Sequence, residues 1–303
     1  MPSMEPAVPE SIPATGRPIR GRSGPADTGR VELGRFLHLR ERTLSVDHSR
    51  LRAAIEGRVV LVTGGTGCIG TAVVRELLDY QPRGVIVVSR GRHDRWPPHA
   101  GVEYHRLDIR SAGEVDRIVR EHRPDIVYHL AAQHDPGLAE RRVAETLSTN
   151  VLGTMNVIRA VARLDGTHLA IASTGKALRP FSRDVYAGSK KAAEWLARQA
   201  AAQARSTMSA VRFTHVVDNS IILGRLQEWC RQREPIRLHD ARSMFYIQSA
   251  REAAQLIIGS ALDPIPGVLT VEAIRDLGWP MSLLDLAVGV SASTGSCSPI
   301  QVC

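Results

Sequence analysis

From Arg58 onward, short apolar runs rich in β-branched residues alternate with longer stretches of helical periodicity. Each apolar run has the length of a strand, and they lie at 59–63, 85–89, 103–107, 125–130, 168–173 and 209–213. The runs at 125–130 and 168–173 are apolar on both faces, which is typical of strands buried in a parallel sheet. Helical patterns lie between the runs, at 71–80, 112–121, 140–162 with one break, and 189–204.

The order of these segments predicts the fold. Regular alternation of strand and helix is typical of an α/β protein with a doubly wound parallel sheet and right-handed crossovers. The pattern weakens after His215, so we expect a small, shortened C-terminal lobe. A helix at about 47–56, with Asp47 or Ser49 as its N-cap, is predicted before the first strand. The expected organisation is a disordered tail, a leader segment, the main α/β domain, a lobe that holds the last strands, and a loose tail, at 1–30, 31–56, 57–214, 215–288 and 289–303.

Composition excludes several classes of function. The net charge is +8, but the arginines are scattered and only 4% of residues are aromatic, so nucleic-acid binding is not expected. The four cysteines show neither a CxxC pair nor metal-ligand spacing, which indicates a reduced, cytoplasmic setting without a metal site. The chain has no apolar run of 18 residues and no signal-peptide pattern, so the sequence predicts no membrane contact.

A glycine-rich turn directly follows the first predicted strand, in the sequence TGGTGCIG at 63–70. Glycines at this spacing permit a tight turn, a close approach of the backbone to a pyrophosphate, and close packing of helix on strand. The helix that begins near Cys68 would present free N–H groups and a positive dipole end to that anion. We therefore predict a dinucleotide site that contains Gly64, Thr66, Gly67, Cys68, Ile69 and Gly70.

The residues at the end of the second strand indicate which dinucleotide is bound. An NAD site usually has an acidic residue there, whereas this chain has Ser89, Arg90 and Arg92. A hydroxyl with guanidinium groups complements a 2′-phosphate, so we predict NADP as the cofactor and 57–214 as an NADP-binding Rossmann domain. Further cofactor contacts are expected where the third and fourth strands end, from Asp108, Ile109, Ala131 and Ala132.

Lysine is rare in this chain and confined to one segment. Arginine outnumbers it by 36 to 3, and the lysines are Lys176, Lys190 and Lys191. The pKa of a lysine ammonium can be lowered by burial or by a neighbouring cation, whereas arginine stays charged. The distribution therefore predicts proton chemistry around 176–190, with Lys191 as a bystander on a solvated helix face.

The sequence YAGSK places Tyr186 and Lys190 one helical turn apart on the same face. A nearby cation lowers the pKa of a phenol, so we expect the phenolate to take the proton of a substrate hydroxyl while hydride leaves its carbon. Ser173 or Thr174 would polarise the same oxygen. With TGxxGxxG, HLAA and TNVLGTMNVI in the expected order, the chain resembles the extended short-chain dehydrogenases/reductases.

The resemblance can be narrowed further. IASTGKA, shortly before YAGSK, is similar to the STDKA…YGATK signature of the CapD-like polysaccharide-biosynthesis branch, which includes inverting UDP-N-acetylglucosamine 4,6-dehydratases. The similarity extends over about 33–287. It implies that bound NADP oxidises the sugar C4, that a lysine removes the C5 proton, that an acid helps to expel the C6 hydroxyl, and that the hydride returns at C6.

The family's roles carry over to matching positions of this chain. Thr174 would bind O4, and Lys176 would be the C5 base. Tyr186 and Lys190 would run the redox step and, with Asn150, contact the cofactor. The residues expected near the substrate are Ser173, His134, His215, Asn219, Arg225 and Arg242.

The chain also departs from the family pattern. Gly175 stands where the family has its acid, and His215 replaces an asparagine. The AALKHVP loop is AAQHDPG here, and two extra residues separate the lysine motif from the tyrosine. Asp184, Asp135, His134 or a bound water are the candidates to replace the missing acid.

The sequence leaves several functions open. The main prediction is an NADP-dependent nucleotide-sugar 4,6-dehydratase that makes an unusual sugar for a glycoconjugate or a specialised metabolite. Without an acid at Gly175, epimerisation at C5 or plain 4-keto reduction are alternatives, as is a degenerate NADP-binding regulator or partner subunit. The nucleotide-holding RPGEK-type segment of the family is also missing, so Arg225, Arg242 or a second chain would complete the lobe. We expect a homo-oligomer.

Overall fold

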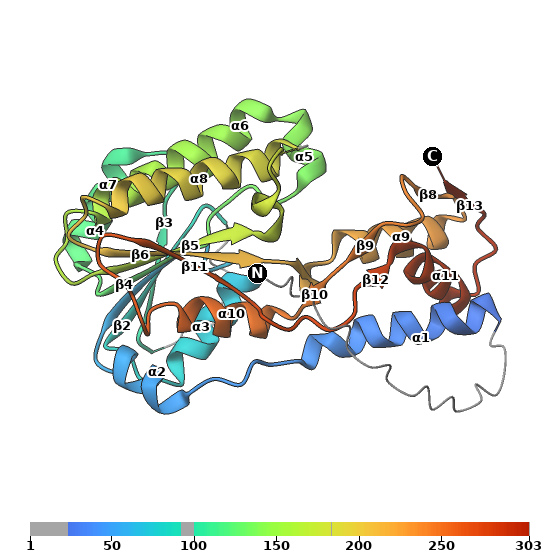
Figure 1. The fold of residues 1–303 in the computed structure, drawn as a ribbon, viewed down its shortest axis with the longest axis horizontal. Coiled ribbons are helices and arrows are strands. Elements are labelled where there is room, and N and C mark those ends of the chain that lie inside the picture. Colours follow the sequence, from blue (N-terminus) through green and yellow to red (C-terminus); the bar gives the residue numbers. More distant parts are fainter. Residues whose placement is uncertain (1–23, 92–99, 183, 303) are drawn as a thin grey trace, which may run out of the picture.

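The computed structural model describes residues 24–91, 100–182 and 184–302. Its centre is a sheet of seven parallel strands (Figure 1), which confirms the predicted fold class. Across the sheet the strands are β11 (Leu269–Ala273), β6 (Thr207–Phe213), β5 (His168–Thr174), β4 (Ile126–His129), β1 (Val59–Thr63), β2 (Gly84–Ser89) and β3 (Val102–Arg106). The six predicted strands are all present, within two residues of their expected bounds.

The seventh strand, β11, lies within 215–288, where the last strands were expected but given no bounds. It pairs with β6 at the sheet edge, and most of its residues are partly or fully exposed. An exposed edge strand needs few apolar residues, so its pattern is weak in the sequence.

Helices cover both faces of the sheet. One face carries α4 (Ala112–His122), α7 (Thr154–Val161) and α8 (Val185–Ala201). The other carries α2 (His48–Ile55), α3 (Cys68–Leu78) and α10 (Ala250–Gly259). The predicted broken helix at 140–162 consists of α5 (Pro136–Arg141), α6 (Val143–Leu147), a π-helical turn at 148–153, and α7. Because strand order reverses between β1 and β4, the carboxyl ends of these strands border the crevice where ligands bind in such sheets.

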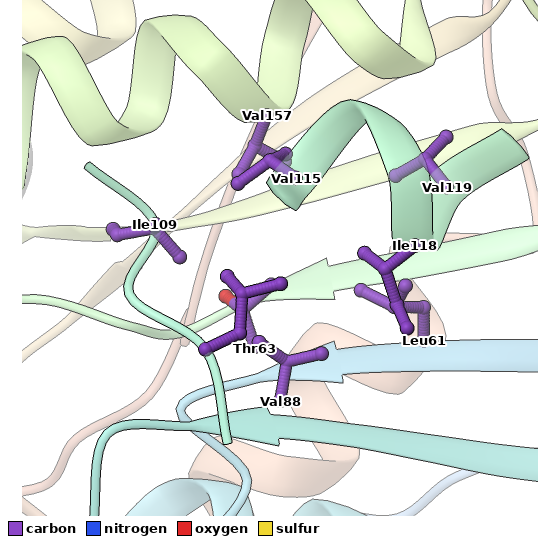
Figure 2. Close-up of a pocket in the computed structure, with 9 residues that line it drawn as sticks. Leu61, Thr63, Val88, Ile109, Val115, Ile118, Val119 and Val157 are labelled. Atoms are coloured by element: carbon purple, nitrogen blue, oxygen red, sulfur yellow. The ribbon is translucent and has the colours of Figure 1, made fainter. Parts of the chain in front are cut away.

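The core between the sheet and α4 is closely packed. Figure 2 shows apolar side chains of β1, β2, α4 and α7 converging on one small gap, among them Leu61, Val88, Val115 and Val157. The gap has a volume of about 10 Å³, which is at the lower limit for one water molecule. It is therefore a packing defect of the core and too small for a ligand.

A second body lies beside the sheet and has its own core. Its elements are α1 (Pro25–His38), α9 (Ile221–Gln232), α11 (Leu283–Thr294), β8 (Ile236–Leu238), β9 (Met244–Phe245), β12 (Met281–Ser282) and β13 (Ile300–Val302). We call this body the lobe. Two further short strands, β7 (His215–Val216) and β10 (Ile247–Gln248), pair with each other where the chain passes from the sheet to the lobe.

Two predicted boundaries are wrong. The tail expected at 1–30 ends earlier, because residues 25–30 begin α1; residues 1–23 lie outside the described part of the chain. The loose tail expected at 289–303 instead contains the end of α11 and strand β13. Both errors come from small residues in the sequence, which give no apolar periodicity although Leu33 and Phe36 of α1 are buried in the lobe core with Leu286 of α11.

The segment between α1 and the first strand is anchored to α10. The guanidinium of Arg42 donates to Glu252 at 2.6 Å and to the Ile247 carbonyl at 2.7 Å, and Leu44 N donates to Gln255 at 2.7 Å. The predicted helix at 47–56 is confirmed as α2, capped by Asp47. Among the helices of the described residues, none is both long and apolar enough to cross a membrane.

Candidate active site

The predicted site residues gather at one edge of the sheet, because parallel strands all end there. The glycine turn follows β1 and leads into α3, whose N-cap is Gly67. Gly64 has a φ of +73°, and a Cβ on it would lie 2.7 Å from Ala131 N. A Cβ on Gly70 would overlap the Gly64 carbonyl oxygen. Only glycine fits both positions, so the turn lies tightly against the end of β4 and leaves the N-terminus of α3 accessible to an anion.

Ser89 and Thr66 meet at the end of β2. Their hydroxyl oxygens are 2.6 Å apart, and Gly91 N donates to Ser89 Oγ at 2.9 Å. Arg90 follows on the surface, with its side chain about half exposed and Nη1 3.9 Å from Asp108. Arg92 lies outside the described residues. A hydroxyl and a guanidinium are thus adjacent at the strand end.

Asp108 and Ile109 were expected to contact the cofactor, but their side chains have other partners in the structure. The Asp108 carboxylate accepts from Arg110 at 2.6 Å, and this bond, with the charge of Arg90, lowers the pKa of Asp108 below its usual value. The Ile109 side chain is buried among the core residues of Figure 2. Asn156 donates to the Ile109 carbonyl at 3.0 Å. The predicted cofactor contact of Ile109 is therefore wrong for its side chain, which turns inward to fill the core.

Asn150 holds two loops of the site together. It is fully buried in the π-helical turn, donates to the Gln133 carbonyl and to Ser189 Oγ, each at 2.9 Å, and accepts from Gln133 N at 2.8 Å. Ala131 and Ala132 lie in the loop that this amide fixes. Asn150 therefore positions the loop after β4 against the start of α8.

Helix α8 carries Tyr186 in its first turn and Lys190 one turn later. Lys190 is buried, donates to the Ala172 carbonyl at 2.8 Å, and has its pKa lowered to about 8 by burial, which the charge of Glu194 partly offsets. Burial, followed by the charge of Asp184, raises the pKa of Tyr186 to about 12. The expectation that Lys190 lowers the pKa of this tyrosine is therefore wrong for the protein without cofactor.

The lysine motif lies beside the tyrosine. Thr174 ends β5, accepts from Lys176 N at 3.3 Å, and forms a hydrogen bond with the Tyr186 side chain. Lys176 is in the 3₁₀ turn at 175–178, and its Nζ is 3.5 Å from Asp184 Oδ2. Asp184 is the N-cap of α8 and accepts from Ala187 N at 2.6 Å. The fold thus brings Thr174, Lys176 and Tyr186 together and adds Asp184.

The side chain of Ser173 does not have the role predicted for it. It is buried, and its hydroxyl donates to Glu194, which also accepts from Arg212 at 2.7 and 2.9 Å. Neighbouring residues of a strand point to opposite faces, so Ser173 and Thr174 cannot both face the site. The predicted substrate contact of Ser173 is therefore wrong.

His215 lies between the lysine motif and the lobe. Its ring is 5.2 Å from Phe245 and 6.2 Å from Phe36, and its Nε2 is 3.0 Å from Ser220 Oγ. Burial, and then the charge of Lys176, lowers the pKa of His215 to about 4, so the imidazole is neutral at pH 7.

An open cavity of about 290 Å³ adjoins this region. His134 Nε2 is 3.1 Å from the amide of Asn219, which lines the cavity. The other lining residues are Arg40, Asp218, Ser220, Ile221, Leu223, Gly224 and Gln227. Sequence reasoning missed Arg40, since nothing distinguishes it from the other arginines of the leader. Arg225 and Arg242 were expected near the substrate, but both are exposed and do not line the cavity.

Metal-ligating groups also occur away from this site. Glu103 and His105 of β3 and His122 of α4 have ligand atoms within 4.8 Å of one another, in the described part of the chain. The cysteines at 68, 230 and 297 are free thiols, and burial raises the pKa of Cys68 in the glycine turn to about 11. The expectation of no bound metal stays a prediction.

Comparisons with known proteins agree with this geometry. The model of a family described as "Polysaccharide biosynthesis protein" matches residues 60–299. The probable polysaccharide biosynthesis protein EpsC of Bacillus subtilis is 25% identical over 279 residues, which are 87% of this chain and 46% of that protein. The inverting UDP-N-acetylglucosamine 4,6-dehydratase of Campylobacter jejuni is 30% identical over 171 residues, 53% of this chain and 50% of that protein. The chain spans about half the length of the curated relatives it matches.

Solved structures share the fold. The epimerase Mth375 of Methanothermobacter thermautotrophicus superposes with a TM-score of 0.72 at 18% identity, over 84% of this chain and 82% of that one. MoeE5, solved with UDP-glucose and NAD, gives a TM-score of 0.66 at 24% identity, over 80% and 85%. At such identities these likenesses establish the architecture alone.

Proposed function

The chain belongs to the polysaccharide biosynthesis protein family, and from this premise we propose that it is an NADP-dependent nucleotide-sugar 4,6-dehydratase. One observation carries the proposal: Thr174 shares a hydrogen bond with the Tyr186 side chain and accepts another from Lys176 N, so the lysine lies next to the hydroxyl and the phenol. A plain dehydrogenase needs only the hydroxyl and the phenol. A lysine in addition supplies a base for a carbon acid.

The residues after β1 and β2 fit a dinucleotide phosphate. Gly64 and Gly70 leave the backbone open to a pyrophosphate at the start of α3. Ser89 and Arg90 supply a hydroxyl and a half-exposed guanidinium for a 2′-phosphate. When bound, the oxidised nicotinamide supplies a hydride acceptor for C4 and a positive charge that favours the phenolate of Tyr186.

Tyr186 and Thr174 act on the C4 hydroxyl. The pKa of Tyr186 is raised to about 12, so the phenol is protonated at rest and must lose its proton before it takes that of the sugar. Lys190, with its pKa lowered to about 8, is still mostly an ammonium at pH 7 but gives up a proton more readily than an ordinary lysine. Thr174 shares a hydrogen bond with Tyr186 and would orient the same oxygen.

Lys176 acts on the next carbon. A ketone at C4 acidifies the C5 proton, and Lys176, once its ammonium has lost a proton, is the base that takes it. Loss of the C6 hydroxyl then gives the 4-keto-5,6-ene, to which the hydride returns. Epimerisation at C5 is the second candidate, because Gly175 leaves the lysine motif without its own acid.

The two functions differ in the mass of their products. We expect a panel of UDP-, GDP- and dTDP-sugars, incubated in heavy water with protein and NADP, to yield one sugar that has lost a water and gained one deuterium at C5. Gain of one deuterium without water loss would indicate the epimerase. No mass change with any sugar would contradict both functions and favour a cofactor-binding partner subunit.

Variants of two lysines test the base. Lys176→Ala should abolish deuterium incorporation at C5 while the protein still binds NADP. Lys191→Ala is the matched control. Lys191 lies on α8 and its Nζ donates at the surface to the carbonyls of Arg179 and Pro180, which precede this helix. Retained exchange in Lys176→Ala would remove this residue as the base.

A further inference from the structure

We propose that Asp184 is the acid that protonates the departing C6 hydroxyl, in place of the carboxylate absent at Gly175, and that it exchanges its proton with Lys176 in each turnover. The proposal rests on the 4,6-dehydratase function proposed above. It assigns a catalytic role to a residue that lies outside the lysine motif.

The geometry of Asp184 suits this role. One carboxylate oxygen, Oδ1, accepts from Ala187 N at 2.6 Å and is thereby fixed to the first turn of α8. The other, Oδ2, is 3.5 Å from Lys176 Nζ. The side chain is 24% exposed, so it is accessible to a substrate that covers Lys176. The charge of Asp184 also raises the pKa of Tyr186, which indicates that carboxylate and phenol are close together.

The other candidate acids have different partners. Asp135 Oδ1 accepts from Leu138 N at 3.1 Å and caps α5. His134 is directed to Asn219 on the cavity side, and the neutral His215 is directed to Ser220. In the described part of the chain, the ion pair of Lys176 is with Asp184.

The proton balance closes over Lys176, Asp184 and Tyr186 together. An ammonium with a carboxylate and an amine with a carboxylic acid contain the same number of protons, and one internal transfer converts the first into the second. In the second form Lys176 takes the C5 proton, the C5–H and C6–O bonds break, and the C5=C6 double bond forms. Asp184 gives its proton to the leaving oxygen, which departs as water. When the hydride returns to C6, the resulting enolate takes a proton at C5 from Lys176. The proton that Tyr186 took from the C4 hydroxyl then replaces the one that left with the water, and the pair regains its starting protons. Exclusion of water by the substrate favours the neutral form, because it weakens the solvation of both charges.

Position 175 offers an internal check. A Cβ added to Gly175 would meet only the Phe213 carbonyl oxygen, at an ordinary contact of 3.8 Å. A Cβ therefore fits at 175 without moving its neighbours. A variant with aspartate at 175 tests whether an acid at either position serves the same reaction.

The test compares Asp184→Asn with the double variant Asp184→Asn/Gly175→Asp. Asparagine still caps the helix but has no proton to donate to the leaving group. We expect Asp184→Asn to lower the rate of water loss by at least about 100-fold, the usual contribution of a general acid. Deuterium exchange at C5 continues in this variant, because the half-exposed Lys176 releases its proton to solvent instead of to Asp184. Gly175→Asp in that background should restore much of the rate. A merely structural role for Asp184 would impair exchange and elimination together and would not be rescued from position 175.

Failure of this proposal is distinguishable from failure of the proposed function. Unchanged water loss in Asp184→Asn, or loss of exchange and elimination in parallel, overturns the role of Asp184 and leaves the dehydratase standing. Exchange without water loss in the unmodified protein overturns both the dehydratase and the acid, but keeps Lys176 as the C5 base. If the unmodified protein shows neither exchange nor water loss, the dehydratase function, the acid role of Asp184 and the base role of Lys176 are all overturned.

Discussion

The three lysines have three different environments, and this explains why they are kept in an arginine-rich chain. Lys190 is buried against the Ala172 carbonyl, where its pKa is lowered to about 8. Lys176 is about half exposed beside a carboxylate. Lys191 caps two carbonyls on the surface, a role that arginine also fills. Burial lowers the pKa of Lys190, which it could not do for an arginine, and the proposed role of Lys176 as a base likewise requires lysine.

The buried Lys190 predicts a pH dependence of stability. Its pKa is about 8 in the folded protein and 10.5 as the ordinary value, so between these pH values the unfolded chain binds a proton that the folded chain lacks. The free energy of unfolding therefore rises with pH through this window. Lys190→Met lacks this contribution. The free energy of unfolding of the unmodified protein should therefore rise, relative to that of the variant, by about 3 kcal/mol from pH 7 to pH 10.5.

Urea unfolding of both proteins without nucleotide, across that pH range, measures the difference. The alkaline titrations of Tyr186 and Cys68 occur in both proteins and cancel. A constant difference between the two proteins would mean that the folded lysine keeps its ordinary pKa.

The cofactor preference is a second prediction about a single residue. Arg90→Ala should reduce the affinity for NADP about tenfold or more and leave that for NAD nearly unchanged, because in the proposed site the guanidinium would bind the 2′-phosphate, which NAD lacks. Arg120→Ala is the matched control, since Arg120 pairs with Asp116 on the surface of α4. Thermal shifts with each nucleotide measure both. Equal losses for NADP and NAD would contradict the assignment.

How far the sequence predicts this site depends on the residue. Positions within a motif, such as Tyr186 and Lys190, follow from spacing along one helix. The partner of Ser173 does not, because Glu194 is 21 residues away on another element. Asp184 could be named as a candidate from the sequence, but only the folded turn brings it to Lys176 rather than to solvent.

At the scale of elements, the least predictable contact joins α1 to α11. The helices approach most closely at Gly29 and Gly289, where a Cβ on either would meet the backbone of the other helix. Close packing on small residues leaves no apolar stripe in the sequence, which is why residues 25–30 of α1 and 289–294 of α11 were expected to lie in tails. The strands of the sheet were predictable because burial on both faces requires continuous apolar runs.

This contact predicts that alanine substitutions at two glycines will affect the stability of the protein very differently. Gly289→Ala would push its Cβ into the Gly29 carbonyl, so we expect a loss of about 1–3 kcal/mol of stability, typical of overpacking. Gly34→Ala, on α1 itself, has open space around it and should be neutral or stabilising by about 0.5–1 kcal/mol. Chemical denaturation of both variants measures the effect. Equal stabilities would mean that the two helices are not in contact.

At the scale of the whole molecule, the lobe is built from distant parts of the chain. Its core joins Leu33 and Phe36 to Leu226, Leu286 and Val290. Local patterns predicted that a lobe follows the sheet, but not that the leader belongs to it, because only folding brings residue 36 to residue 286. Arg42 then fastens the leader to Glu252 of α10 and so connects the lobe to the sheet.

Because the sheet and the lobe have separate cores, we expect NADP and a nucleotide sugar to slow amide exchange in different segments. NADP should slow amide exchange at 64–71 and 89–91, beside the glycine turn, and leave the lobe unchanged. A nucleotide-sugar, with UDP-N-acetylglucosamine as the probe, should slow exchange at 34–42 and 215–224, since the cavity of about 290 Å³ is lined by Arg40 and by the start of α9. Ligand binding stabilises the elements that it contacts, and a body with its own core opens on its own.

Hydrogen exchange followed by mass spectrometry, with each ligand alone and with both, resolves these segments. Arg40→Ala should remove the protection of 215–224 by the sugar nucleotide and keep the protection of 64–71 by NADP, because Arg40 lies on the lobe side of the site. Protection of the lobe by NADP alone, to the same extent as by both ligands, would show that sheet and lobe open as one unit. In that case the leader transmits cofactor binding to the lobe through Arg42, and Arg42→Met should uncouple the two.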